Sequence, residues 1–143
     1  MNGGEISENI CNGRQLSNAA VYAESSGAVR FVMNGGLIEK NSGYYGGVFV
    51  GTIPLLDRLK MRTAEDHAEM EMNGGTIQNN TAKYVGGGIS VFGAASLKMN
   101  SGLILGNTAP AGGGIAVVEV AEKMIEQALE NFVESGMSWG RAV

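Results

Sequence analysis

Short runs of alternating apolar and polar residues recur along the first 117 residues of the chain. Three of these runs, Val48–Val50, Ile89–Val91 and Ile115–Val117, each follow a glycine pair or triplet. Because the side chains of a strand point alternately to its two faces, each run predicts a strand with one buried face. A second alternation, of an apolar residue, any residue and methionine, predicts further strands that end at the methionines.

A nine-residue pattern occurs four times and contains these methionines. Methionine, asparagine, glycine, isoleucine and asparagine recur at offsets 0, 1, 3, 5 and 8 from Met1, Met33, Met72 and Met99. Each unit therefore holds about three short strands, separated by glycine or asparagine corners. Because such short strands cannot bury an apolar face alone, we expect the units to stack as coils of a solenoid.

Stacking would align equal positions of the units in columns. We expect an internal isoleucine ladder, a methionine ladder that Met1 opens, and a corner ladder of asparagines. Stacked asparagine amides can hydrogen-bond from coil to coil and to the backbone of the bend. The expected ladder residues are Ile6, Ile38, Ile77, Ile104, Met33, Met72, Met99, Asn41, Asn80 and Asn107.

The units MNGGTIQNNTAKYVGGGISV and MNSGLILGNTAPAGGGIAVV resemble the right-handed parallel β-helix repeats of bacterial surface proteins. Polymorphic outer-membrane proteins and related adhesin-like proteins carry such repeats. The resemblance implies a pectin-lyase-like solenoid, on an extracellular or surface-displayed chain that serves adhesion or spacing. We therefore expect an all-β fold, a short right-handed parallel β-helix of about four coils over residues 1–117.

Three segments depart from the repeat. Residues 12–28 retain only a degraded unit, in which Ala19 and Ala20 replace corner glycines. Residues 52–68 predict an irregular or helical insertion. From Val117 the apolar period changes to about 3.6 residues, which predicts an amphipathic helix over 118–136. We expect this helix to cap the last coil; an interaction helix is the alternative.

Composition and charge narrow the function classes. The 23 glycines among 143 residues fit repeated sharp bends, and the net charge of -4 argues against binding to nucleic acid phosphates. Cys11 is the single cysteine, so no intrachain disulfide can form. No apolar run is long enough to span a bilayer, and this chain shows no signal peptide. Met1 lies inside the repeat, so we expect a fragment, or self-association or partner binding through an open N-terminal coil.

Polar chemistry is sparse in the repeat columns. Glu5 and Glu39 occupy different offsets, so no carboxylate ladder forms, and the glycine triplets lack the aspartate of calcium-binding repeats. The insertion holds the densest polar group, formed by Asp57, Glu65, Asp66 and His67, which we interpret as a solvated surface. We therefore expect no enzyme activity, no cofactor and no metal site.

Tyr44, Tyr45 and Tyr84 follow the closing asparagines of two units, and we expect their rings to point outward. Such rings can stack on sugars or anchor a protein, although tyrosine is also common on any half-exposed strand edge. The expected function is a non-enzymatic structural or adhesive segment of a bacterial cell-surface-type protein that binds a host or cell-surface protein or glycan. The alternatives are a carbohydrate-active β-helix, such as a polysaccharide lyase or hydrolase, an inert remnant of one, or a platform for the insertion.

Overall fold

The computed structural model describes residues 1–12, 19–25, 27–52 and 65–119. The regular secondary structure within these ranges consists of strands alone, so the described part of the chain is all-β. The strands are β1 (Glu5–Ser7), β2 (Val21–Ser25), β3 (Ala28–Met33), β4 (Leu37–Glu39), β5 (Ser42–Tyr45), β6 (Val48–Thr52), β7 (His67–Met72), β8 (Thr76–Gln78), β9 (Thr81–Val85), β10 (Ile89–Phe92), β11 (Ala95–Met99), β12 (Leu103–Leu105) and β13 (Ile115–Val118).

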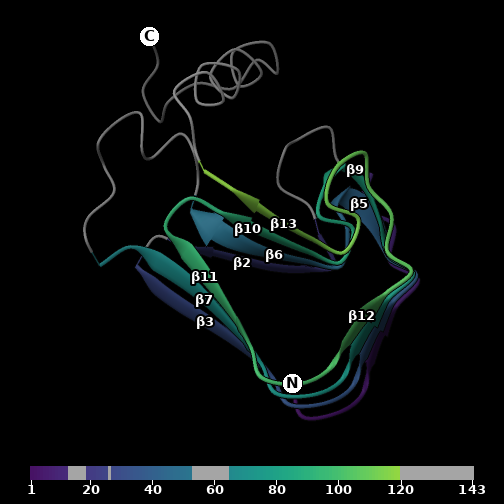
Figure 1. Ribbon diagram of the computed structural model, residues 1–143, viewed down its shortest axis with the longest axis horizontal. Coiled ribbons are helices and arrows are strands. Elements are labelled where there is room, and N and C mark those ends of the chain that lie inside the picture. Colours follow the sequence, from purple (N-terminus) through teal and green to yellow (C-terminus); the bar gives the residue numbers. More distant parts are fainter. Residues whose placement is uncertain (13–18, 26, 53–64, 120–143) are drawn as a thin grey trace, which may run out of the picture.

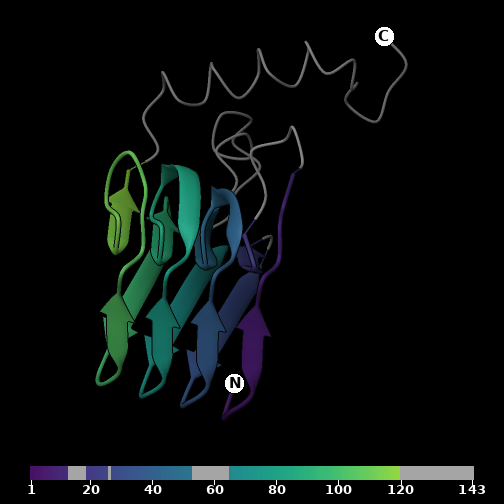
Figure 2. The same cartoon turned by 90° about the vertical axis from the view of Figure 1, so that its right-hand side faces the viewer.

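Each strand pairs in parallel with the strand at the same place in the neighbouring unit. The four sheets have the orders β1-β4-β8-β12, β13-β10-β6-β2, β11-β7-β3 and β5-β9. Figure 1 looks along the stack, so equivalent strands overlap, and Figure 2 shows the units side by side. Equal positions of successive units therefore pair in parallel, as the sequence predicted. The two-stranded sheet of β5 and β9 was not expected, since the sequence predicted three strands in each unit.

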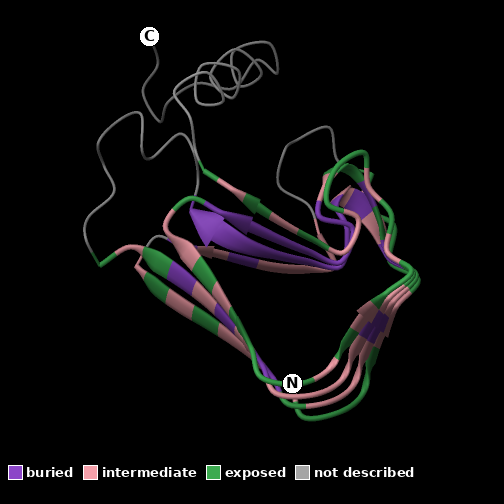
Figure 3. Cartoon of the chain, viewed as in Figure 1, coloured by how far each residue is buried: buried purple, intermediate pink, exposed green. Residues whose placement is uncertain are grey.

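The predicted apolar columns are present in register. Ile38 pairs with Ile6 on one side and Ile77 on the other, and Ile77 pairs with Ile104. In the same way Met33, Met72 and Met99 follow one another along β3, β7 and β11. The inner members of both columns are fully buried, whereas Met99 in the last unit is 42% exposed. Figure 3 shows β6 and β10 coloured mostly as buried.

The glycine at offset 3 leaves space for the end of the methionine side chain of the neighbouring unit. Gly75 has a φ of +88°, in the left-handed region that favours glycine. A Cβ at this position would also lie 2.7 Å from Cε of Met33 and 2.9 Å from the carbonyl oxygen of Gly36. The buried methionine end therefore occupies the space that a side chain would need, which explains why methionine and glycine recur together.

The residue before the closing asparagine of each unit also has a left-handed backbone conformation. In two units this residue is charged. Glu8, Lys40, Asn79 and Gly106 share this column, and the first three have φ values of 57°, 56° and 55°. Asparagine and glycine tolerate such values, but glutamate and lysine do so only at a cost.

Replacing Lys40 by glycine should therefore stabilise the protein. The strain relieved, of order 1–3 kcal/mol, exceeds the added chain entropy of about 0.4–1 kcal/mol. We expect the free energy of unfolding, measured by urea titration, to rise by about 1 kcal/mol. Lys83→Gly is the matched control, because Lys83 lies within strand β9 and its replacement should lower that free energy. Equal effects of the two substitutions would contradict the assignment of strain to Lys40.

The degraded first unit keeps its register. Val21 pairs with Val48, and the amides of Ala20 and Val21 donate to the carbonyl oxygens of Gly46 and Gly47 at 3.2 and 2.9 Å. Alanine at this corner is therefore compatible with a strand that stacks on the second unit.

The expected insertion over 52–68 and the expected helix over 118–136 both overlap strands at their edges. Thr52 closes β6 and His67 opens β7, so strand extends into both edges of the expected insertion, and residues 53–64 lie outside the described residues. Val118 is the last residue of β13, and residues 120–136 of the expected helix also lie outside them. Val117 in the last unit is 76% exposed. The capping prediction concerns residues outside the described ranges and stays a prediction.

Candidate functional site

The corner asparagines form a buried hydrogen-bonded ladder, as predicted. Nδ2 of Asn41 donates to Oδ1 of Asn80 at 3.0 Å, and Nδ2 of Asn80 donates to Oδ1 of Asn107 at 3.0 Å. Each Nδ2 also donates to the carbonyl oxygen of an isoleucine one unit earlier, and each Oδ1 also accepts a backbone amide. Asn9 adds a first member, donating to Asn41 at 2.9 Å. The ladder therefore satisfies the polar groups of the corner.

A second, exposed asparagine ladder runs along the offset-1 column. Asn34 donates to Asn2 at 2.8 Å, Asn73 donates to Asn34 at 2.8 Å, and Asn100 donates to Asn73 at 2.7 Å. Its direction is opposite to that of the buried ladder, because every donor lies in the later unit. The two ladders give each end of the stack a defined pattern of donors and acceptors.

The three candidate tyrosines lie together on β5 and β9. The rings of Tyr44 and Tyr84 stack with centroids 5.1 Å apart and planes at 26°, and Tyr84 is 37% exposed. Tyr45 departs from the prediction, because its side chain is 5% exposed rather than directed outward. Its ring packs on Phe49 and Phe92 at 4.5 and 5.2 Å. Tyr44 and Tyr84 therefore remain as the accessible pair, and Tyr45 supports them from below.

An apolar cluster on the outer face of β2, β6 and β10 buries Tyr45. Phe49 and Phe92 are 2% and 1% exposed, and Tyr22 stacks on Phe49 at 4.5 Å with the planes 9° apart. Sequence reasoning missed this cluster, because it counted only the inward positions of the strands as core. The available signal was the aromatic residue at an outward position, Tyr22 and Phe49, in the same column of two successive units.

Burial raises the pKa values of Tyr44 and Tyr45, the two tyrosines of β5. Burial first, and the neighbouring Tyr84 second, raise the pKa of Tyr44 above its usual value. The pKa of Tyr45 is raised by burial and then by Tyr44 and Tyr84. Both hydroxyl groups are therefore neutral at physiological pH, which suits a surface that binds uncharged rings.

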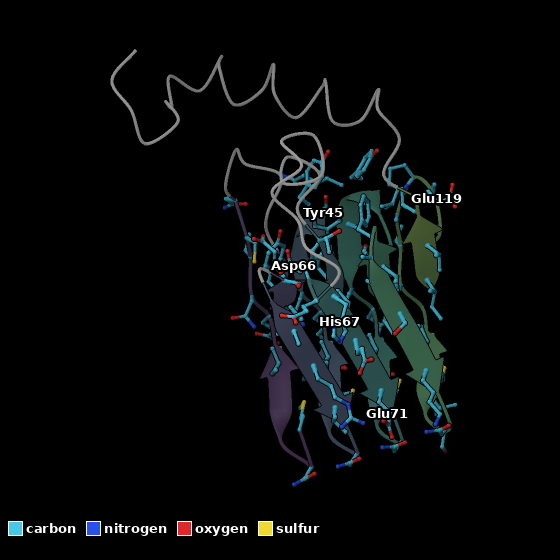
Figure 4. The ribbon with its side chains drawn as sticks, turned by 90° about the vertical axis from the view of Figure 1, so that its left-hand side faces the viewer. Tyr45, Asp66, His67, Glu71 and Glu119 are labelled. Atoms are coloured by element: carbon cyan, nitrogen blue, oxygen red, sulfur yellow. The ribbon has the colours of Figure 1, made fainter. Side chains whose placement is uncertain are left out.

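The polar group expected at the insertion is only partly described. Nδ1 of His67 lies 2.8 Å from the carbonyl oxygen of Glu65, and Nε2 lies 3.9 Å from Oε1 of Glu69. Asp57 lies outside the described residues. Figure 4 shows Asp66, His67 and Glu71 along the face of β3, β7 and β11, apart from Tyr45. Within the described ranges, no three residues of the histidine, cysteine, aspartate and glutamate types form a group that could hold a metal ion.

Two carboxyl groups on the sheet faces have lowered pKa values. Gln78 donates to Glu39 at 2.7 Å, and this hydrogen bond, followed by Lys40, lowers the pKa of Glu39. The pKa of Glu71 is lowered most by a hydrogen bond with Asn73 and next by a hydrogen bond with Arg30. Both groups are therefore ionised at neutral pH and engaged with polar neighbours, the opposite of a carboxyl group poised to donate a proton.

Comparisons with protein-family models, with curated proteins and with solved structures found no match to this chain. Over the described residues, no helix has the length and apolar character needed to cross a bilayer. Among the described residues, the accessible tyrosine pair on β5 and β9 has the clearest binding chemistry.

Proposed function

We propose that the chain is a non-enzymatic structural or adhesive segment of a bacterial cell-surface-type protein, which binds a glycan or protein through its turns. The fold that goes with this proposal is a right-handed parallel β-helix of the adhesin-like kind. The parallel pairing of equal positions in successive units supports it. The cellular location that the proposal implies is extracellular or at the cell surface.

The stacked pair Tyr44 and Tyr84 carries the proposal. Two rings from neighbouring units form a continuous aromatic surface, and Tyr84 exposes over a third of its area. Tyr45, Phe49 and Phe92 lie behind the pair and limit its movement. A rigid aromatic surface with hydroxyl groups at its edge can cover the apolar face of a sugar ring and hydrogen-bond to its edge, at little cost in side-chain entropy.

Substituting Tyr84 should test this surface. On a glycan array we expect binding by the wild-type chain, and titration calorimetry of a bound glycan should show about tenfold weaker affinity for Tyr84→Ala. Tyr84→Phe retains the ring and should retain most of the affinity. Leu103→Ala is the matched control, because Leu103 is 61% exposed on a different sheet.

Two outcomes would contradict the proposal. Turnover of pectate, alginate or a host-type glycan by the wild-type chain would favour the carbohydrate-active alternative instead. Equal binding by the wild type and Tyr84→Ala, with circular dichroism showing both folded, would remove the tyrosine pair from the binding surface.

A further inference from the structure

A register shift between β5 and β9 exposes two neighbouring side chains of β9. Between the paired positions on either side, β5 has one residue, Tyr44, where β9 has two, Lys83 and Tyr84. Neighbours in a regular strand point to opposite faces. Here the preceding residue, Ala82, is 3% exposed, whereas Lys83 and Tyr84 are both exposed. The extra residue therefore presents a cation next to the accessible tyrosine pair.

The charge of Lys83 has no acidic partner within the described ranges. The other lysine and arginine residues of these ranges each interact with a glutamate: Arg30 with Glu71, Lys40 with Glu39, and Lys98 with Glu71. The ion pairs among the described residues do not include Lys83. In a chain whose net charge is -4 at pH 7, an exposed cation without such a partner is available to a ligand of opposite charge.

The acidic side chain that affects the tyrosines acts on the buried one. The pKa of Tyr45 is raised by burial, then by its two tyrosine neighbours, and last by the carboxylate of Glu24 on β2. The pKa of Tyr44 is raised by burial and then by Tyr84, and no acidic side chain contributes. Strands β5 and β9 themselves contain no acidic residue. A negative charge on a bound ligand would therefore meet Lys83 without an acid of these two strands beside it.

We propose that this surface selects sugars that carry an anionic substituent, a carboxylate or a sulfate. The inference rests on the proposed function, in which Tyr44 and Tyr84 bind a sugar ring, and it adds the charge of the ligand. The apolar face of the ring lies on the tyrosines, and the ammonium group of Lys83 pairs with the anionic group at the edge of the ring. Because lysine is a compact charge on a flexible stem, it can reach an anionic group at more than one ring position.

The exposure of Lys83 sets the size and the salt dependence of this selectivity. An ion pair that is open to water contributes little, so the anionic form of a sugar should bind about fivefold more tightly than its neutral form. Salt screens such a pair, whereas the contact between the rings and the apolar face of the sugar does not depend on charge. At high ionic strength the preference should therefore disappear while binding of the sugar ring remains.

The test uses the full chain and a glycan array that carries neutral, carboxylated and sulfated forms of the same sugars. The anionic forms should give the stronger signals, and their two kinds separate carboxylate from sulfate. Titration calorimetry of the strongest anionic ligand and its neutral form should then show the fivefold difference. Lys83→Gln should remove this difference without weakening the neutral form, and Lys83→Arg should keep it. Lys98→Gln is the matched control, because Lys98 is an exposed lysine on β11, in a different sheet.

Three results would overturn the selectivity, and they separate it from the proposed function. Equal binding of neutral and anionic forms, with both lost in Tyr84→Ala, would remove the role of Lys83 and leave the tyrosine surface in place. A preference that persists in Lys83→Gln would assign the anionic group to another cation. A wild type that binds no glycan on the array would overturn both proposals. If circular dichroism shows that Lys83→Gln does not fold, the wild type decides: a preference that survives about 1 M salt, where screening acts within about 3 Å, would contradict an exposed ion pair.

Discussion

Replacing Asn80 by alanine should strongly destabilise this protein. Asn80 is fully buried, and its amide makes four hydrogen bonds: two donated from Nδ2, to Ile38 and Asn107, and two accepted by Oδ1 from Asn41. The substitution would remove the acceptor of the buried backbone amide of Asn41 and of one Nδ2 hydrogen of Asn41, and it would remove the side-chain donor of the Ile38 carbonyl oxygen. Each such group costs about 1–3 kcal/mol, so we expect the free energy of unfolding in urea to fall by about 4 kcal/mol.

Asn73→Ala is the matched control for this prediction. Asn73 also bridges two units, donating to Asn34 at 2.8 Å and accepting from Asn100 at 2.7 Å, but its ladder is exposed to water. Water can replace the lost bonds there, so the expected loss is below about 1 kcal/mol. If both substitutions lowered the free energy of unfolding equally, burial of the corner ladder would not be the source of its contribution.

The repeat made the columns of this structure predictable from sequence. Four aligned copies of one pattern placed Ile38 beside Ile77 and Asn41 beside Asn80, because stacking units of equal path brings equal offsets together. The same alignment also indicated glycine bends at fixed offsets. Periodicity and turn chemistry are local properties, so they could be read without knowing the surroundings of each side chain.

The surroundings of Tyr45 could not be read in this way. Its burial depends on Phe49 and Phe92, which come from the outer face of a neighbouring sheet, and no local pattern brings these three rings together. The opposite directions of the two asparagine ladders were hidden for a related reason. The sequence shows that asparagines align, whereas the direction of donation depends on how each corner turns.

Replacing Gly75 by alanine should be the second strongly destabilising change. The φ of +88° at Gly75 costs an alanine about 1–2 kcal/mol. In addition, its Cβ would lie 2.7 Å from Cε of the buried Met33 and 2.9 Å from the carbonyl oxygen of Gly36, so the two units would have to move apart. Such overpacking adds about 1–3 kcal/mol, and we expect the free energy of unfolding in urea to fall by about 3 kcal/mol in total.

Gly4→Ala separates the backbone strain from the steric contact with the neighbouring unit. Gly4 occupies the same column of the repeat as Gly75 and also has a positive φ, but no atom of another unit lies near it. Gly4 has a φ of +83°, and a Cβ added there would meet no atom within 4 Å. We therefore expect this control to lose only the backbone term, about 1–2 kcal/mol. Equal losses for Gly4→Ala and Gly75→Ala would mean that the methionine column does not need the glycine for space. The Met33 side chain is the cause if Gly75→Ala costs less in a Met33→Ala background, relative to Met33→Ala alone, than in the wild type, since a methionine shortened to alanine no longer reaches the new Cβ.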